Sequence, residues 1–434
     1  MKNMSSGKKQ KLTIFSATLA SAAMALPAMQ FAYADAPPER GIVSFKYLNY
    51  QESQSLAGIQ SGTTQPVSTT TSTTHIHDVI SGASTLATSS GGTATGGTST
   101  GGNAGSGNQN RIGINAYAIM ALVPIAGEWS IGTTYTSDSV SGASPRYHSS
   151  GLTPMTDLRR AIDVNLTRYF SRGTLSIGTN YSKETDYLFR GYSVQGTLST
   201  EDKNTTFTLG GSLNSDDINP IIPPYNQYHK KVYAGIFSIT RVLSKNDIVQ
   251  LNLGYSNGNG DFTDHYKLYD NRPTERNSTT ILTRWNHHLE TTDGTAKLSY
   301  RYYSDTFGIR AHTLEGEYVQ PLQNGWTVIP LLRLYTQTEA DFYVAVGAAE
   351  KADPTIVTAP PATAVYYTED QRLSAFGALT LGLKVSKQLH ADWLADVKIE
   401  GYEQRNQWAL NGKGDPGLAT FKARSIQIGL SRLF

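Results

Sequence analysis

The feature that most restricts the fold of this chain is an alternation of apolar and small polar residues, which recurs from residue 41 to the end. The last ten residues, SIQIGLSRLF, place Ile426, Ile428 and Leu430 on one side of the chain. Successive side chains of a strand point to opposite faces of a sheet, so this pattern predicts a strand with one apolar face. Phe434 continues that face, and Arg432 interrupts it.

The same alternation marks further segments, at 111–122, 206–213, 248–256, 295–305 and 379–387. In the first of them, Ile112, Ile114, Ala116, Ala118, Met120 and Leu122 share the apolar face. Each segment has roughly ten residues, enough for a tilted strand to cross a bilayer. No stretch after the first 34 residues approaches the ~18 uninterrupted apolar residues of a spanning helix.

The connections between these segments alternate between short and long. Short turns are expected at 125–128, 171–173, 201–204, 244–247, 291–294, 323–325 and 390–392. Longer polar loops are expected at 139–156, 216–229, 257–276, 340–370 and 404–419, and two further connections, near 188–189 and 307–308, look short. The pattern predicts an all-β fold, a transmembrane antiparallel up-and-down β-barrel of about sixteen strands, with both termini at the short-turn, periplasmic end.

The tryptophans favour the same arrangement. Trp129, Trp326 and Trp393 each follow a short turn, Trp285 precedes one, and Trp408 belongs to a long loop. Aromatic rings favour the headgroup level of a membrane, so four of the five would form a girdle at one edge. In the alternative, a soluble β-sandwich, core tryptophans need not gather beside turns.

The first 34 residues are typical of a secretory signal peptide. Lysines precede a mostly apolar run at 12–26, and Ala32-Tyr33-Ala34 forms a small-x-small cleavage site. A membrane anchor is the alternative, but the run is short and is broken by Pro27. We therefore expect a signal peptide at 1–34 and one barrel domain at 35–434.

Residues 61–110 form a Ser/Thr/Gly-rich segment of low complexity. Such a composition buries too little apolar surface to offset chain entropy, which predicts a disordered loop between the first two strands. His75 and His77 have a spacing that suits a metal on a strand, but no further ligand accompanies them. We therefore predict no metal site.

Composition excludes several other functions. The chain has no cysteine, so disulfides, thiolate sites and covalently attached haem are absent. Its formal net charge of +2 gives no reason to expect nucleic-acid binding. No GxSxG motif is present, although His287 and His288 leave a rim-sited hydrolase as a remote hypothesis. We predict no enzyme activity and no cofactor.

The inward faces of the later strands carry charge. Alternation places a candidate lumen network at Arg284, His288, Lys297, Arg301, Glu315, Glu317 and Arg333, whereas inward positions of the first half are mostly Gly, Ser, Thr and Asn. One interpretation is a charged constriction that selects solutes. The other is a structural network that braces the wall through paired charges.

Several long runs resemble a known family. They include APPERGIVSFKYLNYQ, DSVSGASPRYH, YKLYDNRPTERN, LTRWNHHL, LSYRYYSDTFGIRAHTLEGEYVQPL and DQRLSAFGALTLGLKV. Together they resemble a Gram-negative outer-membrane β-barrel family catalogued as a domain of unknown function (family 3570), over all of the mature chain except 61–110. The resemblance implies a barrel without a settled activity. Relatives encoded beside flavin-transferase and thioredoxin-like proteins imply periplasmic or extracellular redox partners.

The end of the chain also resembles the signal read by the barrel-assembly machinery, since Gly429, Leu430 and Phe434 match it and Arg432 departs from it. The sequence thus predicts a protein in contact with lipid in the outer membrane of a Gram-negative cell. Its most favoured function is a porin-like channel for small solutes. The alternative is a non-conducting membrane scaffold for redox partners.

Overall fold

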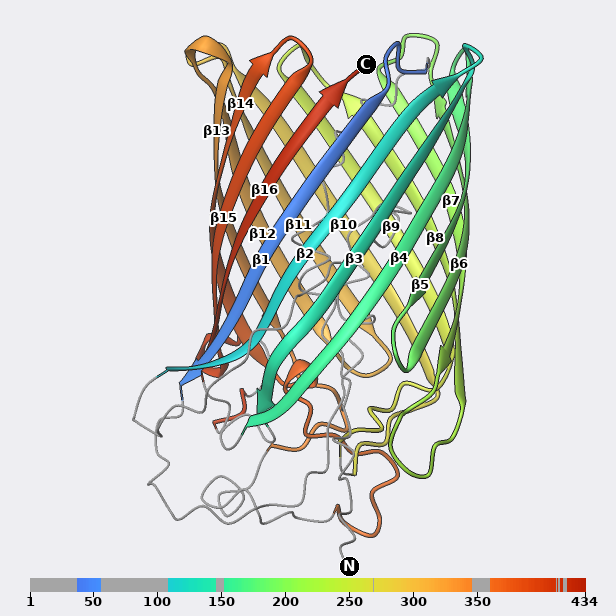
Figure 1. The fold of residues 1–434 in the computed structure, drawn as a ribbon, viewed down its shortest axis with the longest axis vertical. Coiled ribbons are helices and arrows are strands. Elements are labelled where there is room, and N and C mark those ends of the chain that lie inside the picture. The colour runs from blue at the N-terminus through green and yellow to red at the C-terminus, as the bar shows by residue number, and fades with distance from the viewer. Residues whose placement is uncertain are drawn as a thin grey trace, which may run out of the picture.

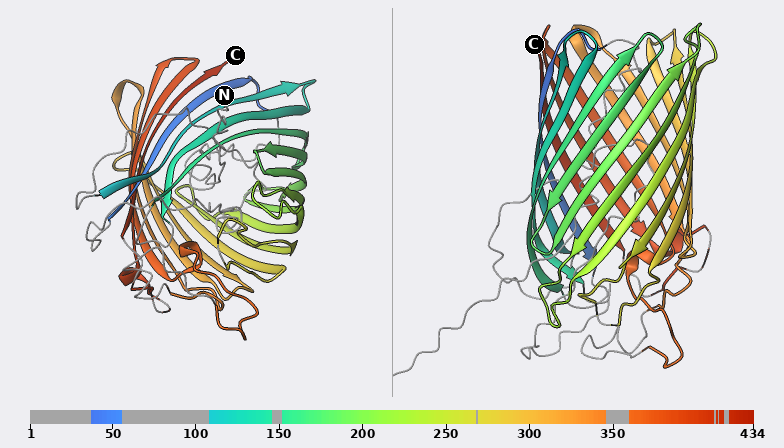
Figure 2. Two further views of the ribbon diagram at one scale, coloured as in Figure 1. Left: turned by 60° about the horizontal axis from the view of Figure 1, so that its bottom comes forward. Right: turned by 90° about the vertical axis from the view of Figure 1, so that its right-hand side faces the viewer.

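The computed structural model describes residues 37–55, 108–145, 152–267, 269–345, 360–410, 412, 414–416 and 420–434. The signal peptide expected at 1–34 and residues 61–107 of the expected insertion lie outside this part of the chain. Within it, sixteen antiparallel strands close into one barrel (Figures 1 and 2). The predicted all-β barrel fold and its strand number are confirmed.

The strands are long and tilted. They are β1 (Ile42–Ser55), β2 (Asn108–Ile125), β3 (Trp129–Pro145), β4 (Leu152–Phe170), β5 (Gly173–Lys183), β6 (Tyr187–Ser199), β7 (Thr205–Ile218), β8 (Tyr228–Val242), β9 (Asp247–Gly260), β10 (Glu275–Leu289), β11 (Gly294–Asp305), β12 (Arg310–Pro321), β13 (Trp326–Gln337), β14 (Phe376–His390), β15 (Trp393–Arg405) and β16 (Phe421–Leu433). Because β2 begins at Asn108, the last three residues of the insertion expected at 61–110 belong to a strand.

Closure joins the first strand to the last. Each strand pairs with its neighbours in sequence, and β1 pairs with both β2 and β16. Gly41 and Phe434 complete this seam with two backbone hydrogen bonds, of 3.0 and 2.9 Å. A Cβ atom at Gly41 would collide with the ring of Phe434, so only glycine fits there without a shift of that ring. β1 therefore begins where β16 ends, at the short-turn end.

The seven predicted short turns all separate consecutive strands, at the end of the barrel where β16 finishes (Figure 1). The two short connections at the other end lie at 184–186 and 306–309. In one place, strand pairing continues farther than the alternation of residues predicted. β3 and β4 pair from Trp129↔Arg168 to Pro145↔Leu152, so most of the loop expected at 139–156 is strand.

The outer face is apolar, as predicted for a barrel in lipid. In β16, Ile426 and Ile428 are 45% and 50% exposed, and they point away from the lumen. The segment 111–122 differs, because Ile112 and Ile114 are only 6% and 1% exposed and lie on the inner side. They belong to a buried apolar cluster that includes Leu48 of β1. Here the outer face is instead formed by residues such as Tyr117 and Ile119.

Aromatic rings gather at the short-turn end, as the tryptophan positions predicted. Trp129, Trp326 and Trp393 begin β3, β13 and β15. A cation lies over each ring, at 5.1 Å (Arg168), 5.1 Å (Lys387) and 5.3 Å (Arg432) from the ring centre. Arg432, which interrupts the apolar face of β16, thus covers an aromatic ring at the membrane edge.

Helices are confined to three single turns among the described residues, η1 (Gln323–Gly325), η2 (Gln371–Leu373) and η3 (Asn406–Trp408). None of the described helices is long and apolar enough to cross a membrane.

Candidate functional site in the barrel lumen

The seven residues of the predicted lumen network lie on four consecutive strands, β10 to β13. Their neighbours in sequence, Trp285, Leu298, Leu314 and Leu332, are 43–46% exposed on the outer face. Alternation therefore directs the network residues inward.

The fold brings only some of these residues into contact. Glu315 and Arg333 lie directly opposite each other, and their Oε2 and Nε atoms are 2.5 Å apart. His288 lies 3.7 Å from Asp293, in the turn that follows β10. Lys297 lies opposite Glu317 in register. Within the described residues, no ion pair joins these two.

The remaining cations of the network, Arg284 and Arg301, form no ion pair with any described residue. The inner face of β10–β13 carries five cationic side chains, Arg276, Arg284, Lys297, Arg301 and Arg333, against three carboxylates, and Arg276 pairs with one of these, Asp305, at 2.6 Å. The adjacent face of β14 and β15 is balanced, because Lys384 pairs with Asp396 at 3.6 Å and Lys398 with Glu400 at 2.9 Å. The wall of β10–β13 therefore holds an excess of positive charge.

The other half of the barrel contains charged residues that the sequence did not single out. Four buried carboxylates gather there near a single arginine, which forms ion pairs with two of them, Asp138 and Glu184. We call this group the wall cluster: Asp138, Asp157, Arg159, Glu184 and Asp186. Asp138 on β3 faces Arg159 on β4, and accepts a hydrogen bond of 3.2 Å from its Nε. The inner face of these strands is thus not lined by small polar residues alone.

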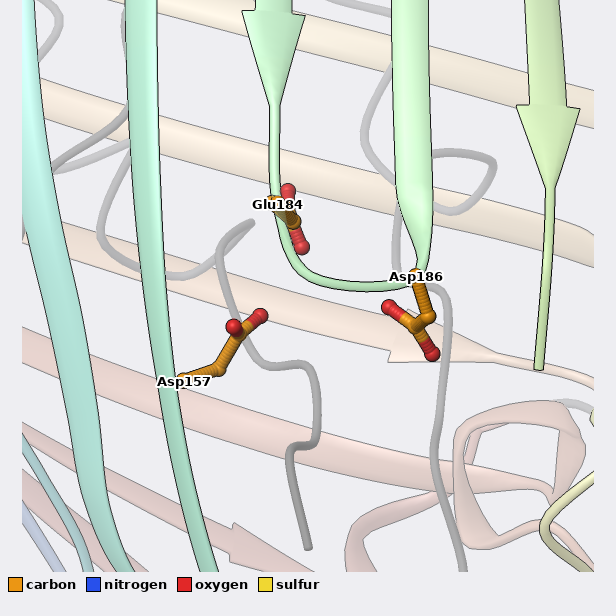
Figure 3. Close-up of side chains that lie close together, drawn as sticks. All are labelled: Asp157, Glu184 and Asp186. Atoms are coloured by element: carbon orange, nitrogen blue, oxygen red, sulfur yellow. The ribbon is translucent and has the colours of Figure 1, made fainter. Parts of the chain in front are cut away.

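Three members of the wall cluster converge (Figure 3). Asp157 lies on β4, and Glu184 and Asp186 lie in the connection between β5 and β6. One oxygen from each carboxylate lies within 4.8 Å of the other two, and all three residues are buried. The sequence contained a signal for this arrangement, since Glu184-Thr185-Asp186 forms the turn that we expected near 188–189. Tyr187 and Phe189 instead belong to β6 and pack in the buried apolar cluster, so the turn is formed by the acidic residues that precede them.

Two carboxylates of the wall cluster, Glu184 and Asp186, have raised pKa values. Burial, followed by repulsion from Asp157, raises the pKa of Glu184 well above its ordinary value. Burial raises the pKa of Asp186 to about 7, although a hydrogen bond from Tyr266 opposes this change. Both shifts reflect carboxylates that are removed from water without enough positive charge nearby.

A second buried ionic group lies in the loops at the same end of the barrel. This loop cluster pairs three acids with three cations, namely Asp264, Asp270, Asp370, Lys267, Arg272 and Arg372. Arg272 bridges Asp270 at 2.8 Å and Asp370 at 2.9 Å, across 98 residues of sequence. Phe262, Phe307 and Leu373 form an apolar cluster beside it.

The loop cluster keeps Asp370 ionised, whereas burial raises the pKa of Asp264 to about 6 in spite of the charges of Lys267 and Arg372. Burial opposes ionisation of Asp370, but the charges of Arg372, Lys267 and Arg272 outweigh it and hold the pKa of Asp370 well below its ordinary value. Tyr266 connects the two clusters, because its hydroxyl donates to Asp186 while its backbone lies in the loop 261–274. The same hydroxyl accepts a hydrogen bond of 2.9 Å from the backbone of Ile221.

A closed barrel with an apolar outer face, an aromatic girdle and a largely polar inner wall defines an outer-membrane β-barrel protein, in contact with lipid. The chain matches the family described as "Protein of unknown function (DUF3570)" over residues 16–227 and 221–424. It belongs to that family, which confirms the resemblance noted from its sequence.

Solved structures with a similar fold are distant in sequence. A bacterial polysaccharide outer membrane secretin is 7% identical, with 90% of this chain and 98% of that chain covered and a TM-score of 0.45. OccK2 (OpdF) of Pseudomonas aeruginosa is 9% identical, with 91% and 98% covered and a TM-score of 0.40. A Pseudomonas aeruginosa FadL homologue is 8% identical, with 91% and 90% covered and a TM-score of 0.41. No curated protein matches the chain significantly.

Proposed function

We propose that this protein is a porin-like channel for small polar solutes in the outer membrane of a Gram-negative cell. The observation that carries the proposal is the contrast between the two faces of β10–β13. Outward residues are apolar, whereas Arg284, Lys297 and Arg301 face the lumen without an ion-pair partner among the described residues. Charges that only brace a wall are expected to be paired, and these three are not.

The excess positive charge of this wall would favour anions. A ring of charge along a pore attracts ions of the opposite sign, and a charge in a water-filled lumen contributes roughly 1 kcal/mol at ~4 Å. A barrel with this number of strands encloses a lumen wide enough for water. We therefore expect a modest preference for anions over cations.

Planar-bilayer recordings on the refolded protein test the proposal. We expect stepwise conductance, with a reversal potential in a salt gradient that shows anion preference. Replacing both Arg284 and Arg301 by Gln should shift the permeability ratio toward cations by roughly two- to fivefold, since each charge contributes at most ~1 kcal/mol in water. Replacing both Glu315 and Glu317 by Gln should shift it the opposite way.

Asp202→Asn is the matched control, because Asp202 is exposed in the short turn at 201–204 and should leave selectivity unchanged. Refolded protein that gives no current at any voltage would exclude the channel. That result would favour the non-conducting scaffold for redox partners. Conductance with unchanged selectivity in both double variants would assign the four replaced residues a purely structural role.

Assembly of the barrel depends on the end of the chain in this proposal. Phe434 is 53% exposed and follows the last residue of β16, beside the seam with β1. We propose that the barrel-assembly machinery recognises β16 through this ring. Phe434→Ala should lower the amount of folded protein in the outer membrane, and unchanged folding yield would exclude this role.

A further inference from the structure

The pairing of β4 with β5 explains why the three carboxylates of Asp157, Glu184 and Asp186 meet. The ladder ends at Arg160↔Lys183, and its register, if continued, would set Asp186 opposite Asp157. The chain turns there instead, and β6 begins at Tyr187. The turn thereby carries two acidic side chains into the space beside the end of the ladder (Figure 3).

Two of the oxygens in this space lack donors. Oδ1 of Asp186 and Oε1 of Glu184 are buried without a hydrogen-bond partner among the described residues. The cation nearest to Glu184 is Arg159, whose Nε lies 4.0 Å from Oε1 and already donates to Asp138. Asp157 is better satisfied, since its Oδ1 accepts from the backbone of Leu158 at 2.7 Å and from Thr185 at 3.2 Å.

Ionised carboxylates that are 1–7% exposed need a counter-charge. We propose that Asp157, Glu184 and Asp186 bind a divalent cation, and that this cation is Ca²⁺. Two oxygens bound to one ion at ~2.4 Å are at most ~4.8 Å apart, as expected for Ca²⁺. The three oxygens satisfy that limit.

The donor set favours calcium over other common metals. All three side chains are carboxylates, whereas zinc and copper sites usually include His or Cys. Mg²⁺ requires shorter bonds of ~2.0–2.1 Å in strict octahedral geometry and keeps several waters. A buried site on a short connection suits the flexible coordination of Ca²⁺ better. The bound ion would fasten the β5–β6 connection to β4 and, through the Tyr266 hydrogen bond to Asp186, to the loop 261–274.

Calorimetric titration of the full-length refolded protein in detergent with CaCl₂ tests the site. We expect one Ca²⁺ per chain, and weaker binding of MgCl₂. Asp186→Asn and Glu184→Gln should each weaken Ca²⁺ binding by roughly tenfold or more, because affinity follows the number of charged ligands. Asp202→Asn is the control, since it removes a carboxylate at the opposite end of the barrel. Equal binding by all four proteins, or no binding by the wild type at millimolar Ca²⁺, overturns the proposal.

Thermal unfolding provides a second readout, after migration of unboiled protein has shown that each variant is folded. Ca²⁺ should raise the melting temperature of the wild type relative to chelator, since a ligand that binds only the folded state stabilises it. Asp186→Asn should show no such increase. If the carboxylates instead share protons, the wild type will melt at the same temperature with Ca²⁺ and with chelator, and the site is excluded. Neither experiment depends on whether the barrel conducts.

Discussion

The wall cluster and the loop cluster are both buried ionic groups at the same end of the barrel, and they differ in charge balance. The loop cluster sets three cations against three acids. The wall cluster sets Arg159 alone against four acids. The pKa of Asp370 is accordingly held well below its ordinary value, whereas the pKa of Asp186 is raised to about 7.

This difference shows that burial alone does not decide the state of a carboxylate. Burial opposes ionisation in both clusters, and the outcome depends on how closely cations surround each carboxylate, since Asp370 is held ionised by the same cations that leave the pKa of Asp264 raised to about 6. In the balanced cluster, Asp370 is fully compensated by its three cations. An unbalanced cluster needs protons or an added cation. The wall cluster is therefore the place where a ligand has most to contribute.

The largest effect is expected from Arg272→Met in the loop cluster. This change leaves Asp270 and Asp370 with fewer cations in a buried setting, and breaking a buried ion pair costs about 3–5 kcal/mol. Peptides from 261–274 and 360–375 should exchange hydrogen faster, because both loops lose stability and open more often. Arg241→Met on the exposed end of β8 is the control. Unchanged protection would mean that the apolar cluster alone holds these loops.

An intermediate effect, of opposite sign in the two clusters, is expected from removing one acid. Asp370→Asn should destabilise its loops by about 2–3 kcal/mol, because the hydrogen bonds that it loses are to charged groups. Asp186→Asn, measured in chelator, should leave stability unchanged or raise it, because it relieves repulsion among carboxylates. Hydrogen exchange measures the effect of Asp370→Asn on its loops, and thermal unfolding measures the effect of Asp186→Asn. Losses of equal size would contradict the distinction between the clusters.

The smallest effect is expected in the lumen wall, where the Glu315–Arg333 pair is half-exposed. The side chains are 36% (Arg333) and 28% (Glu315) exposed, so water screens the pair. Arg333→Met should cost at most about 1 kcal/mol in urea unfolding. A loss as large as that of Arg272→Met would show that this wall is braced by its charges, which would weaken the channel proposal.

Much of the barrel follows from local pattern. The period-two alternation located the strands, because a strand between lipid and lumen must change polarity at every residue. Turn residues located all seven short turns, and the tryptophans beside them marked the membrane edge. The inward direction of Arg284, Arg301 and Glu315 also follows from alternation, since Trp285 and Leu314 fix the outer face.

Alternation could not decide which face of an apolar strand meets lipid. Ile112 and Ile114 form an apolar stripe, yet they face the lumen, because both faces of β2 carry apolar residues and closure against β1 sets the register. The ends of strands were also uncertain. β3 and β4 extend past the expected loop, since pairing with a partner strand stabilises residues whose own composition is that of a loop.

The sequence by itself determined the strands and the turns of this protein, and the lipid-facing positions of strands with a single apolar face, because each depends on residues that are near neighbours in the chain. Only the tertiary structure decided which charges meet. Asp157 reaches Asp186 through the register of β4 with β5, and Arg272 reaches Asp370 across 98 residues. The folded structure therefore decides the charge balance of a buried site, since the cost of burying a carboxylate depends on every cation that folding brings beside it.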